Sequence, residues 1–153
     1  MEWPRTRNPR RKAPSHPTPW AWEAQAKLHR EAKPPRPDNE LLIVGRLGNS
    51  LTAVAWSEAV YRPPADPHVL LIFLGVDLAH QGRHGHGKDA LVQTLTQWAR
   101  SYPEARSLQV RANVHIRNEE SAGLAGSIGL SVAEPATPPH NPYSVWAGPV
   151  RIL

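Results

Sequence analysis

The stretch VLLIFLGVDLAHQGRHGHGKDAL, residues 69–91, decides how this chain folds. Its first part, Val69–Val76, is an uninterrupted apolar run with the length and composition of a buried β-strand. From Ala90 onward apolar side chains recur at helical spacing, at Leu91, Leu95, Trp98 and Tyr102. The sequence therefore predicts a core strand, a loop rich in glycine and basic residues, and an amphipathic helix over residues 88–101.

The loop at residues 81–88 has the composition of an anion-binding site. Its glycines let the backbone approach a ligand closely and turn several amides toward one point. The following helix adds N–H groups and the positive end of its dipole, and Arg83 and Lys88 add full charges. The loop lacks the Gly-Lys-Ser/Thr of a P-loop and the glycine spacing of a Rossmann fingerprint. We interpret it as a phosphate cradle, with an ordinary exposed turn as the alternative.

Composition limits the classes of protein to which the chain can belong. Its 153 residues suffice for one domain with a real core. It has no cysteine, which excludes a disulfide framework and zinc sites built on thiolates. It also lacks an apolar run of the roughly 20 residues that span a membrane, and a secretory h-region. We expect a cytoplasmic protein without membrane contact, either a monomer or a homodimer.

The basic character of the chain is confined to its beginning. Residues 1–37 carry a net charge of +6, whereas residues 38–153 carry −1. Residues 1–19 hold five of the 17 prolines and are predicted to be a disordered arm, which either contacts nucleic acid or only aids solubility. Residues 20–153 are predicted to form a single domain that begins with a helix at Trp20–Lys33.

The remaining elements predict an α+β fold. Strands over residues 41–46 and 51–61, joined by a tight turn, precede the central strand without an intervening helix, which favours an antiparallel meander. Residues 107–115 alternate like a half-buried strand, and Asn118 is placed to cap a second helix that ends near Gly129. Tyr143–Trp146 is the best strand candidate in the C-terminal segment.

Two segments resemble motifs of the GNAT superfamily of acetyl-CoA-dependent N-acetyltransferases, over about residues 41–130. The first motif, V-x-x-x-x-[Q/R]-G-x-G-x-G/A followed by a helical leucine, is matched by Val76, Gln81, Gly82, Arg83, Gly85, Gly87 and Leu91. The second, N-x-x-[A/S]-x-x-L-Y-x-x-x-G-F, is matched by Asn118, Ser121, Leu124, Gly129 and Leu130. Two departures affect function: His84 lengthens the glycine loop by one residue, and Ala125 replaces the tyrosine that usually protonates the CoA thiolate.

The resemblance implies a mixed, mainly antiparallel sheet with flanking helices, in which the central strand splays from its parallel neighbour at residues 107–115. It also implies acetyl-CoA as co-substrate, with the pantetheine arm in the splay and the pyrophosphate in the glycine loop. By the same resemblance, the residues that bind acetyl-CoA are Val76, Leu78, Gln81, Gly82, Arg83, His84, Gly85, His86, Gly87, Lys88, Asn118 and Ser121.

Acetyl transfer requires a base for the amine, stabilisation of the oxyanion and departure of sulfur. Backbone N–H groups at the splay serve the second need. Glu58 is the first candidate for the base, with a solvent-facing role as its alternative, and Asp77 and His80 follow. Tyr143 or Ser121 is a candidate to protonate the thiolate, which otherwise leaves unaided.

The histidines of the loop suggest a rival interpretation. His80, His84 and His86 lie within seven residues and have the side chains of a zinc site. Because the loop offers only Asp77 and Asp89 as nearby carboxylates, we expect no metal there.

The predicted function is transfer of an acetyl group from acetyl-CoA to a primary amine within a ternary complex. One alternative is a CoA-binding module that has lost catalysis, suggested by Ala125. Another is a nucleic-acid-associated acetyltransferase anchored by residues 1–19. No motif specifies the acceptor, so a small molecule, a peptide, a protein and a charged tRNA all remain open.

Overall fold

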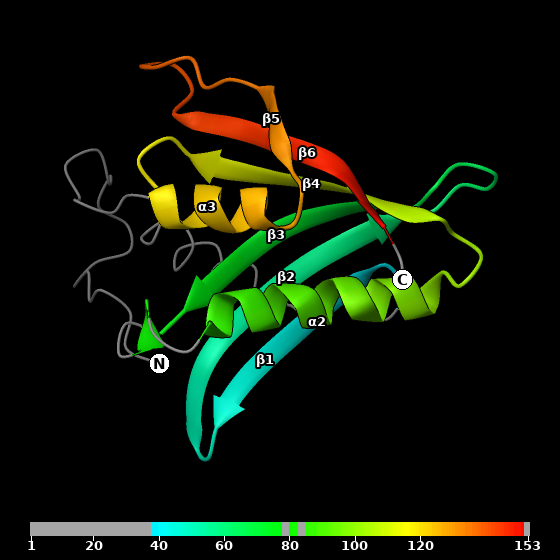
Figure 1. The fold of residues 1–153 in the computed structure, drawn as a ribbon, viewed down its shortest axis with the longest axis horizontal. Coiled ribbons are helices and arrows are strands. Elements are labelled where there is room, and N and C mark those ends of the chain that lie inside the picture. Colours follow the sequence, from blue (N-terminus) through cyan, green and yellow to red (C-terminus); the bar gives the residue numbers. More distant parts are fainter. Residues whose placement is uncertain (1–37, 78–79, 83–84, 152–153) are drawn as a thin grey trace.

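A computed structural model describes residues 38–77, 80–82 and 85–151 of the chain. In this part of the chain a single sheet has the strand order β1-β2-β3-β4-β6-β5, and the helices α2 and α3 cover one of its faces (Figure 1). The predicted arm and the predicted helix at residues 20–33 lie outside the described residues. The elements are β1 (Glu40–Leu47), β2 (Ser50–Val60), β3 (His68–Val76), α2 (His86–Ser101), β4 (Ser107–His115), α3 (Glu119–Ser127), β5 (Ser131–Glu134) and β6 (Tyr143–Arg151).

The first three strands form the antiparallel meander that the sequence predicts. β1 and β2 are joined by a tight turn in which Gly48 has a φ of 58°, a conformation that favours glycine. β2 then pairs antiparallel with β3. The predicted bounds of these strands agree with the observed ones to within one residue at each end, the usual scatter of strand limits.

The central pair of strands, β3 and β4, is parallel and separates along its length. Their ladder joins only His68–Leu71 to Gln109–Ala112, although β3 continues to Val76 and β4 to His115. The two strands diverge toward the end of the sheet at which α2 begins, and α3 lies over the divergence (Figure 1). The predicted α+β fold, with a mainly antiparallel sheet and a splayed central pair, is confirmed.

The divergence begins at a β-bulge in β3. On the side of β2, Ser57 lies opposite Leu71 and Trp56 opposite Phe73, so Ile72 has no residue across from it. Leu71 is also the last residue of β3 that pairs with β4. Because a bulge bends its strand and increases the local twist, the inserted Ile72 turns the rest of β3 away from β4.

The core lies between the helices and the covered face of the sheet. The buried side chains of α2 include the three at helical spacing that the sequence predicts, Leu91, Leu95 and Trp98. Ala90 and Thr94 are buried as well. The Nε1–H of Trp98 donates to the Oγ of the fully buried Ser57 over 2.8 Å, which ties α2 to β2. The other side chains of the main cluster come from β2, β3, β4, α3 and the residue before β5: Ala59, Val69, Leu108, Val110, Ala125 and Leu130.

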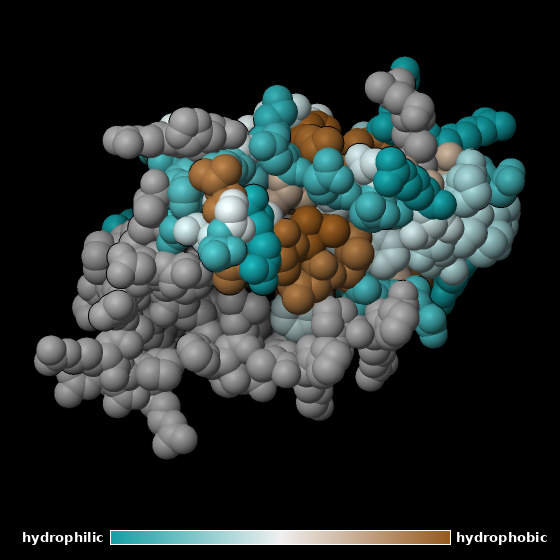
Figure 2. All heavy atoms as spheres, turned by 90° about the horizontal axis from the view of Figure 1, so that it is seen from below, coloured by the Kyte–Doolittle hydropathy of each residue, from teal (hydrophilic) through white to brown (hydrophobic). Residues whose placement is uncertain are grey.

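Some features of the C-terminal strands and of the edge strand β1 were not predicted from the sequence. β6 continues well beyond Trp146, and the bounds of the short edge strand β5 were not predicted. Leu42 and Val44 of the edge strand β1 are exposed, and apolar surface is visible on the side of the molecule nearest β1 (Figure 2). No helix in the described part of the chain is long and apolar enough to cross a membrane.

Candidate functional site

The edge of β3 beyond the bulge presents backbone groups toward β4. The N–H of Asp77 donates to the carbonyl of Thr52 over 2.9 Å, and Val76 lies opposite Ala53. In an antiparallel ladder, successive residues turn their N–H and C=O groups to opposite sides. The backbone groups of Val76 and Leu74 therefore point away from β2 and into the divergence.

The facing edge of β4 is arranged in the same way. The N–H of Ile116 donates to the carbonyl of Pro142, so the alternate residues His115 and Asn113 direct their backbone groups toward β3. The carbonyl of His115 accepts from the N–H of Asn118 over 2.8 Å. Two strand edges thus line the divergence, and an extended ligand can pair with such an edge as an added strand does.

The N-terminus of α2 lies at the open end of the divergence. Its N-cap is Gly85, with a φ of 67° and no side-chain capping hydrogen bond. A Cβ on Gly87 would lie 3.2 Å from the Cγ2 of Val76 and 3.8 Å from the Cδ2 of Leu124, so this first turn fits closely between the end of β3 and α3. The first N–H groups of a helix have no intrahelical partner, and they carry the positive end of its dipole. The arrangement suits an anion.

The loop before α2 folds back onto the end of β3. The Nε2 of Gln81 donates to the carbonyl of Val76 over 3.1 Å, so one predicted ligand-binding residue contacts another. The rings of His80 and His86 meet edge to face with centroids 5.3 Å apart, and the Nε2 of His80 lies 3.8 Å from a carboxylate oxygen of Asp77. Within residues 38–77, 80–82 and 85–151 no group of three side chains is placed to hold a metal ion.

The structure places most of the predicted binding residues around this open end. Gln81, Gly82 and Lys88 are exposed there. Gly85, His86 and Gly87 form the beginning of α2, and Asn118 and Ser121 begin α3. Predictions for three further residues fall outside the described chain: Leu78, Arg83 and His84.

Helix α3 begins with the predicted cap, in contrast to α2. The Oδ1 of Asn118 accepts from the N–H of Ser121 over 3.1 Å. Ala125, at the position where the GNAT motif has tyrosine, is 6% exposed and packs in the main core cluster. This position therefore contributes apolar packing and no hydroxyl group.

A cavity of about 280 Å³ opens on the face of the sheet away from α2. The last paired residues of β3 and β4 are Leu71 and Ala112. The cavity is lined by the residue before the first of these, Leu70, and by the residue after the second, Asn113. The cavity therefore adjoins the closed end of the divergence. Its lining consists of Glu58, Val60, His68, Val69, Leu70, Arg111 and Asn113.

The two predicted catalytic side chains are not brought together. Glu58 is half-buried in the wall of the cavity, level with Leu70 of β3. Tyr143, the first residue of β6, packs its ring against that of His115, with centroids 5.3 Å apart and planes at 87°. The Cα atoms of Glu58 and Tyr143 are three strands apart across the sheet and about four residues apart along it, which corresponds to a distance of roughly 20 Å.

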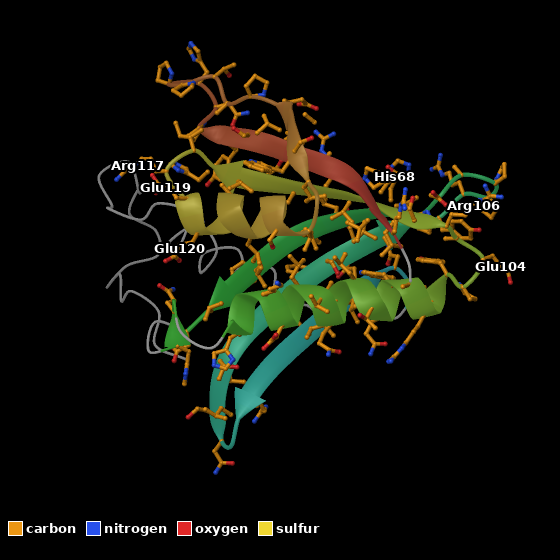
Figure 3. All side chains as sticks on the ribbon, viewed as in Figure 1. His68, Glu104, Arg106, Arg117, Glu119 and Glu120 are labelled. Carbon is orange, nitrogen blue, oxygen red and sulfur yellow. The ribbon has the colours of Figure 1, made fainter. Side chains whose placement is uncertain are left out.

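Polar and charged side chains lie at both ends of the central strands. Arg117, Glu119 and Glu120 lie near the start of α3, at the open end of the divergence, whereas His68 lies at the opposite end (Figure 3). Burial, and secondarily the charge of Arg117, lowers the pKa of His115 below the ordinary value of 6.5. The Nδ1 of this histidine accepts from the N–H of Arg117 over 3.2 Å, which requires that Nδ1 be unprotonated.

No protein-family model matches the sequence, and no curated protein matches it. Its structure is similar to that of the ribosomal-protein-S18-alanine N-acetyltransferase of Escherichia coli, with a TM-score of 0.60 over 90% of this chain and 82% of that one, at 17% identity. The chain has the GNAT N-acetyltransferase fold.

Other GNAT-fold structures agree. A GNAT-family acetyltransferase from Streptococcus pneumoniae gives a TM-score of 0.54 at 15% identity, over 87% of this chain and 77% of that one. Arabidopsis thaliana NAA60, solved with a bisubstrate analogue, gives 0.55 at 13% identity, over 83% and 91%. At these identities the comparison establishes the fold.

Sequence reasoning missed the polar lining of the cavity. Arg111 and Asn113 stand at alternate positions of β4, on the face opposite the buried Val110 and Ala112, and this alternation was a usable signal. His68 carried no such signal, because it directly precedes the apolar run of the central strand.

We predict that His115 makes folding stability depend on pH. Because its pKa is lowered in the folded state, the unfolded state binds more protons as the pH falls through 6.5, and stability decreases there. The free energy of unfolding, measured with urea between pH 8 and pH 5, should fall less steeply toward acid in a His115→Gln variant. Equal slopes for the two proteins would contradict this assignment.

Proposed function

We propose that this protein transfers the acetyl group of acetyl-CoA to a primary amine by direct attack within a ternary complex. The observation that supports it is the divergence of β3 and β4 after Leu71, with an uncapped helix N-terminus at its open end and a polar cavity at its closed end. Structures of similar fold were solved with acetyl-CoA and with a bisubstrate analogue, both of Arabidopsis NAA60.

The residues around the divergence suit the parts of acetyl-CoA. The pantetheine arm carries amide groups, which would pair with the backbone edge of Leu74 and Val76. The pyrophosphate would lie against the N–H groups that follow Gly85, with the exposed Lys88 adding a positive charge. Since Gln81 donates to the carbonyl of Val76 in the free protein, the arm would displace that side chain.

The acceptor would enter from the cavity on the other side. Acetyl-CoA supplies a thioester, whose C–S bond breaks as the amine nitrogen forms the new C–N bond. Glu58, in the cavity wall, would take the proton that the ammonium loses. Backbone N–H groups near the bulge at Ile72 would donate to the oxygen that gains negative charge. Tyr143 lies too far from Glu58 to protonate the sulfur of the same thioester, so CoA would leave as the thiolate without a proton donor.

We predict that acetyl-CoA binds and that Gly85→Ala weakens binding. Alanine is strained at a φ of 67° by about 1–2 kcal/mol, which would shift the loop and raise Kd roughly tenfold in isothermal titration. The matched control is Gly48→Ala, in the β1–β2 turn, because Gly48 has a similar φ of 58° and equally open surroundings. It should lose comparable stability but keep the wild-type Kd. Absence of heat at millimolar acetyl-CoA would refute the proposal.

We further predict that Glu58→Gln lowers kcat by about 10²- to 10⁴-fold, because the amide cannot accept the proton. The Kd of acetyl-CoA should not change, since Glu58 lies outside the divergence. Glu104→Gln, an exposed substitution in the turn that follows α2, serves as the control (Figure 3). Retention of full turnover by Glu58→Gln would remove Glu58 as the base.

A CoA-binding module without turnover is the second candidate. The observation that favours it is Ala125, whose buried methyl group stands where the motif places a proton donor. Binding of acetyl-CoA without product across a panel of primary amines would select this candidate over the enzyme.

A further inference from the structure

The cavity on the face away from α2 is lined by an acidic residue, Glu58, on one side of Leu70 and by a basic residue, Arg111, on the other side. Glu58 lies opposite Leu70 in the β2–β3 ladder, and Leu70 lies opposite Arg111 in the β3–β4 ladder. The three residues therefore form one row across neighbouring strands, with their side chains on the same face. Two strand spacings separate the Cα atoms of Glu58 and Arg111 by about 10 Å, and Leu70 forms the floor between them.

The rest of the cavity limits the size and polarity of its occupant. Its volume of about 280 Å³ lies just below the range of roughly 300–1,000 Å³ that holds drug-sized ligands. Val60 and Val69 add apolar lining beside Leu70, whereas Asn113 adds an amide at the closed end of the divergence. The lining thus suits a small molecule with an apolar part and two charged or polar ends.

We infer that the acceptor is a free α-amino acid, bound with its ammonium against Glu58 and its carboxylate against Arg111. This inference rests on the proposed function and names the substrate class of the same site. In an α-amino acid a single carbon separates the nitrogen from the carboxylate. With one charge-assisted hydrogen bond of about 2.7–2.9 Å at each end, such a molecule can span the distance between the Glu58 and Arg111 side chains.

Arg111 is available for such a contact. Its Nη2 lies 3.1 Å from the Oε1 of Glu134, but the two side chains are 53% and 62% exposed. An ion pair this exposed is worth only about 0–1 kcal/mol, and a guanidinium has five N–H donors. A carboxylate inside the cavity can therefore bind Arg111 beside Glu134 or in its place.

The test compares amino acids with their neutral counterparts. Acetylation is measured for each standard L-amino acid and for the corresponding L-amino-acid amide, with acetyl-CoA saturating. We expect at least one amino acid to exceed its amide roughly tenfold or more in kcat/KM, because a hydrogen bond between charged groups is worth about 1.5–3 kcal/mol.

Variants assign the preference to Arg111. Arg111→Gln should raise KM for the preferred amino acid at least about tenfold and leave the amide unchanged. Arg100→Gln, an exposed substitution on α2 across the sheet, should change neither. Glu134→Gln should preserve or strengthen the preference, because it removes the competing carboxylate of Arg111.

The outcomes separate this inference from the proposed function. If amides or peptides are acetylated with the same kcat/KM as amino acids, or if Arg111→Gln weakens acid and amide alike, the inference fails and the acetyltransferase proposal stands.

If nothing is acetylated, the amino acids are titrated into the CoA-saturated protein and into the free protein, with the Asn113 side-chain amide followed by NMR. A saturable shift supports the site, and no shift at tens of millimolar overturns it. Absence of acetyl-CoA binding counts against the proposed function alone.

Discussion

The parallel strands β3 and β4 stop pairing after Leu71 and Ala112, and the proposed site depends on this early end of their ladder. A parallel pair normally continues its ladder as long as both strands run, since unpaired backbone groups in a sheet are costly. Here the extra residue Ile72 bends β3 at the point where pairing ends. Gln81 and Asn118 donate to two of the resulting edge carbonyls, those of Val76 and His115. The other polar groups of the two edges need water or an extended ligand, and for this reason we propose that the divergence binds one.

Each diverging strand is held firmly on its other edge. β4 pairs with β6 along its whole length, from Ser107 to His115, and β3 pairs with β2 up to Val76. The covered face adds α2, whose Trp98 bonds to Ser57 and whose Gly87 fits against Val76. Closing the divergence would break one of these ladders, so the fold keeps both edges apart without a ligand. Such preorganisation lowers the cost of binding.

Much of this arrangement could be predicted from local sequence. The apolar run of β3, the helical spacing of Leu91 and Leu95, and the cap at Asn118 each express a short-range preference. The order of elements and the two GNAT motifs then predicted the parallel neighbour of β3 and the splay. The placement of the glycine loop at the N-terminus of α2 followed from the same motifs.

The remainder depends on contacts between distant residues. Nothing local marks Ile72 as a bulge, because register is set by how β2 and β3 pair as a whole. The opposition of Glu58 and Arg111 likewise arises only when three strands are aligned. Tyr143 was considered for its hydroxyl group, whereas the structure shows its ring packed against His115. Chemistry-bearing residue types can be recognised in a sequence, but their distances follow from the strand register.

Amide hydrogen exchange along β3 tests the central claim most directly. In the free protein the N–H groups of Leu74 and Val76 should exchange fast, because they face the divergence, while that of the intervening Gly75, which faces β2, should be protected. Saturating acetyl-CoA should slow Leu74 and Val76 and leave Gly75 unchanged. Equal protection of all three amides in the free protein would show that β3 remains paired with β4, and would contradict the account.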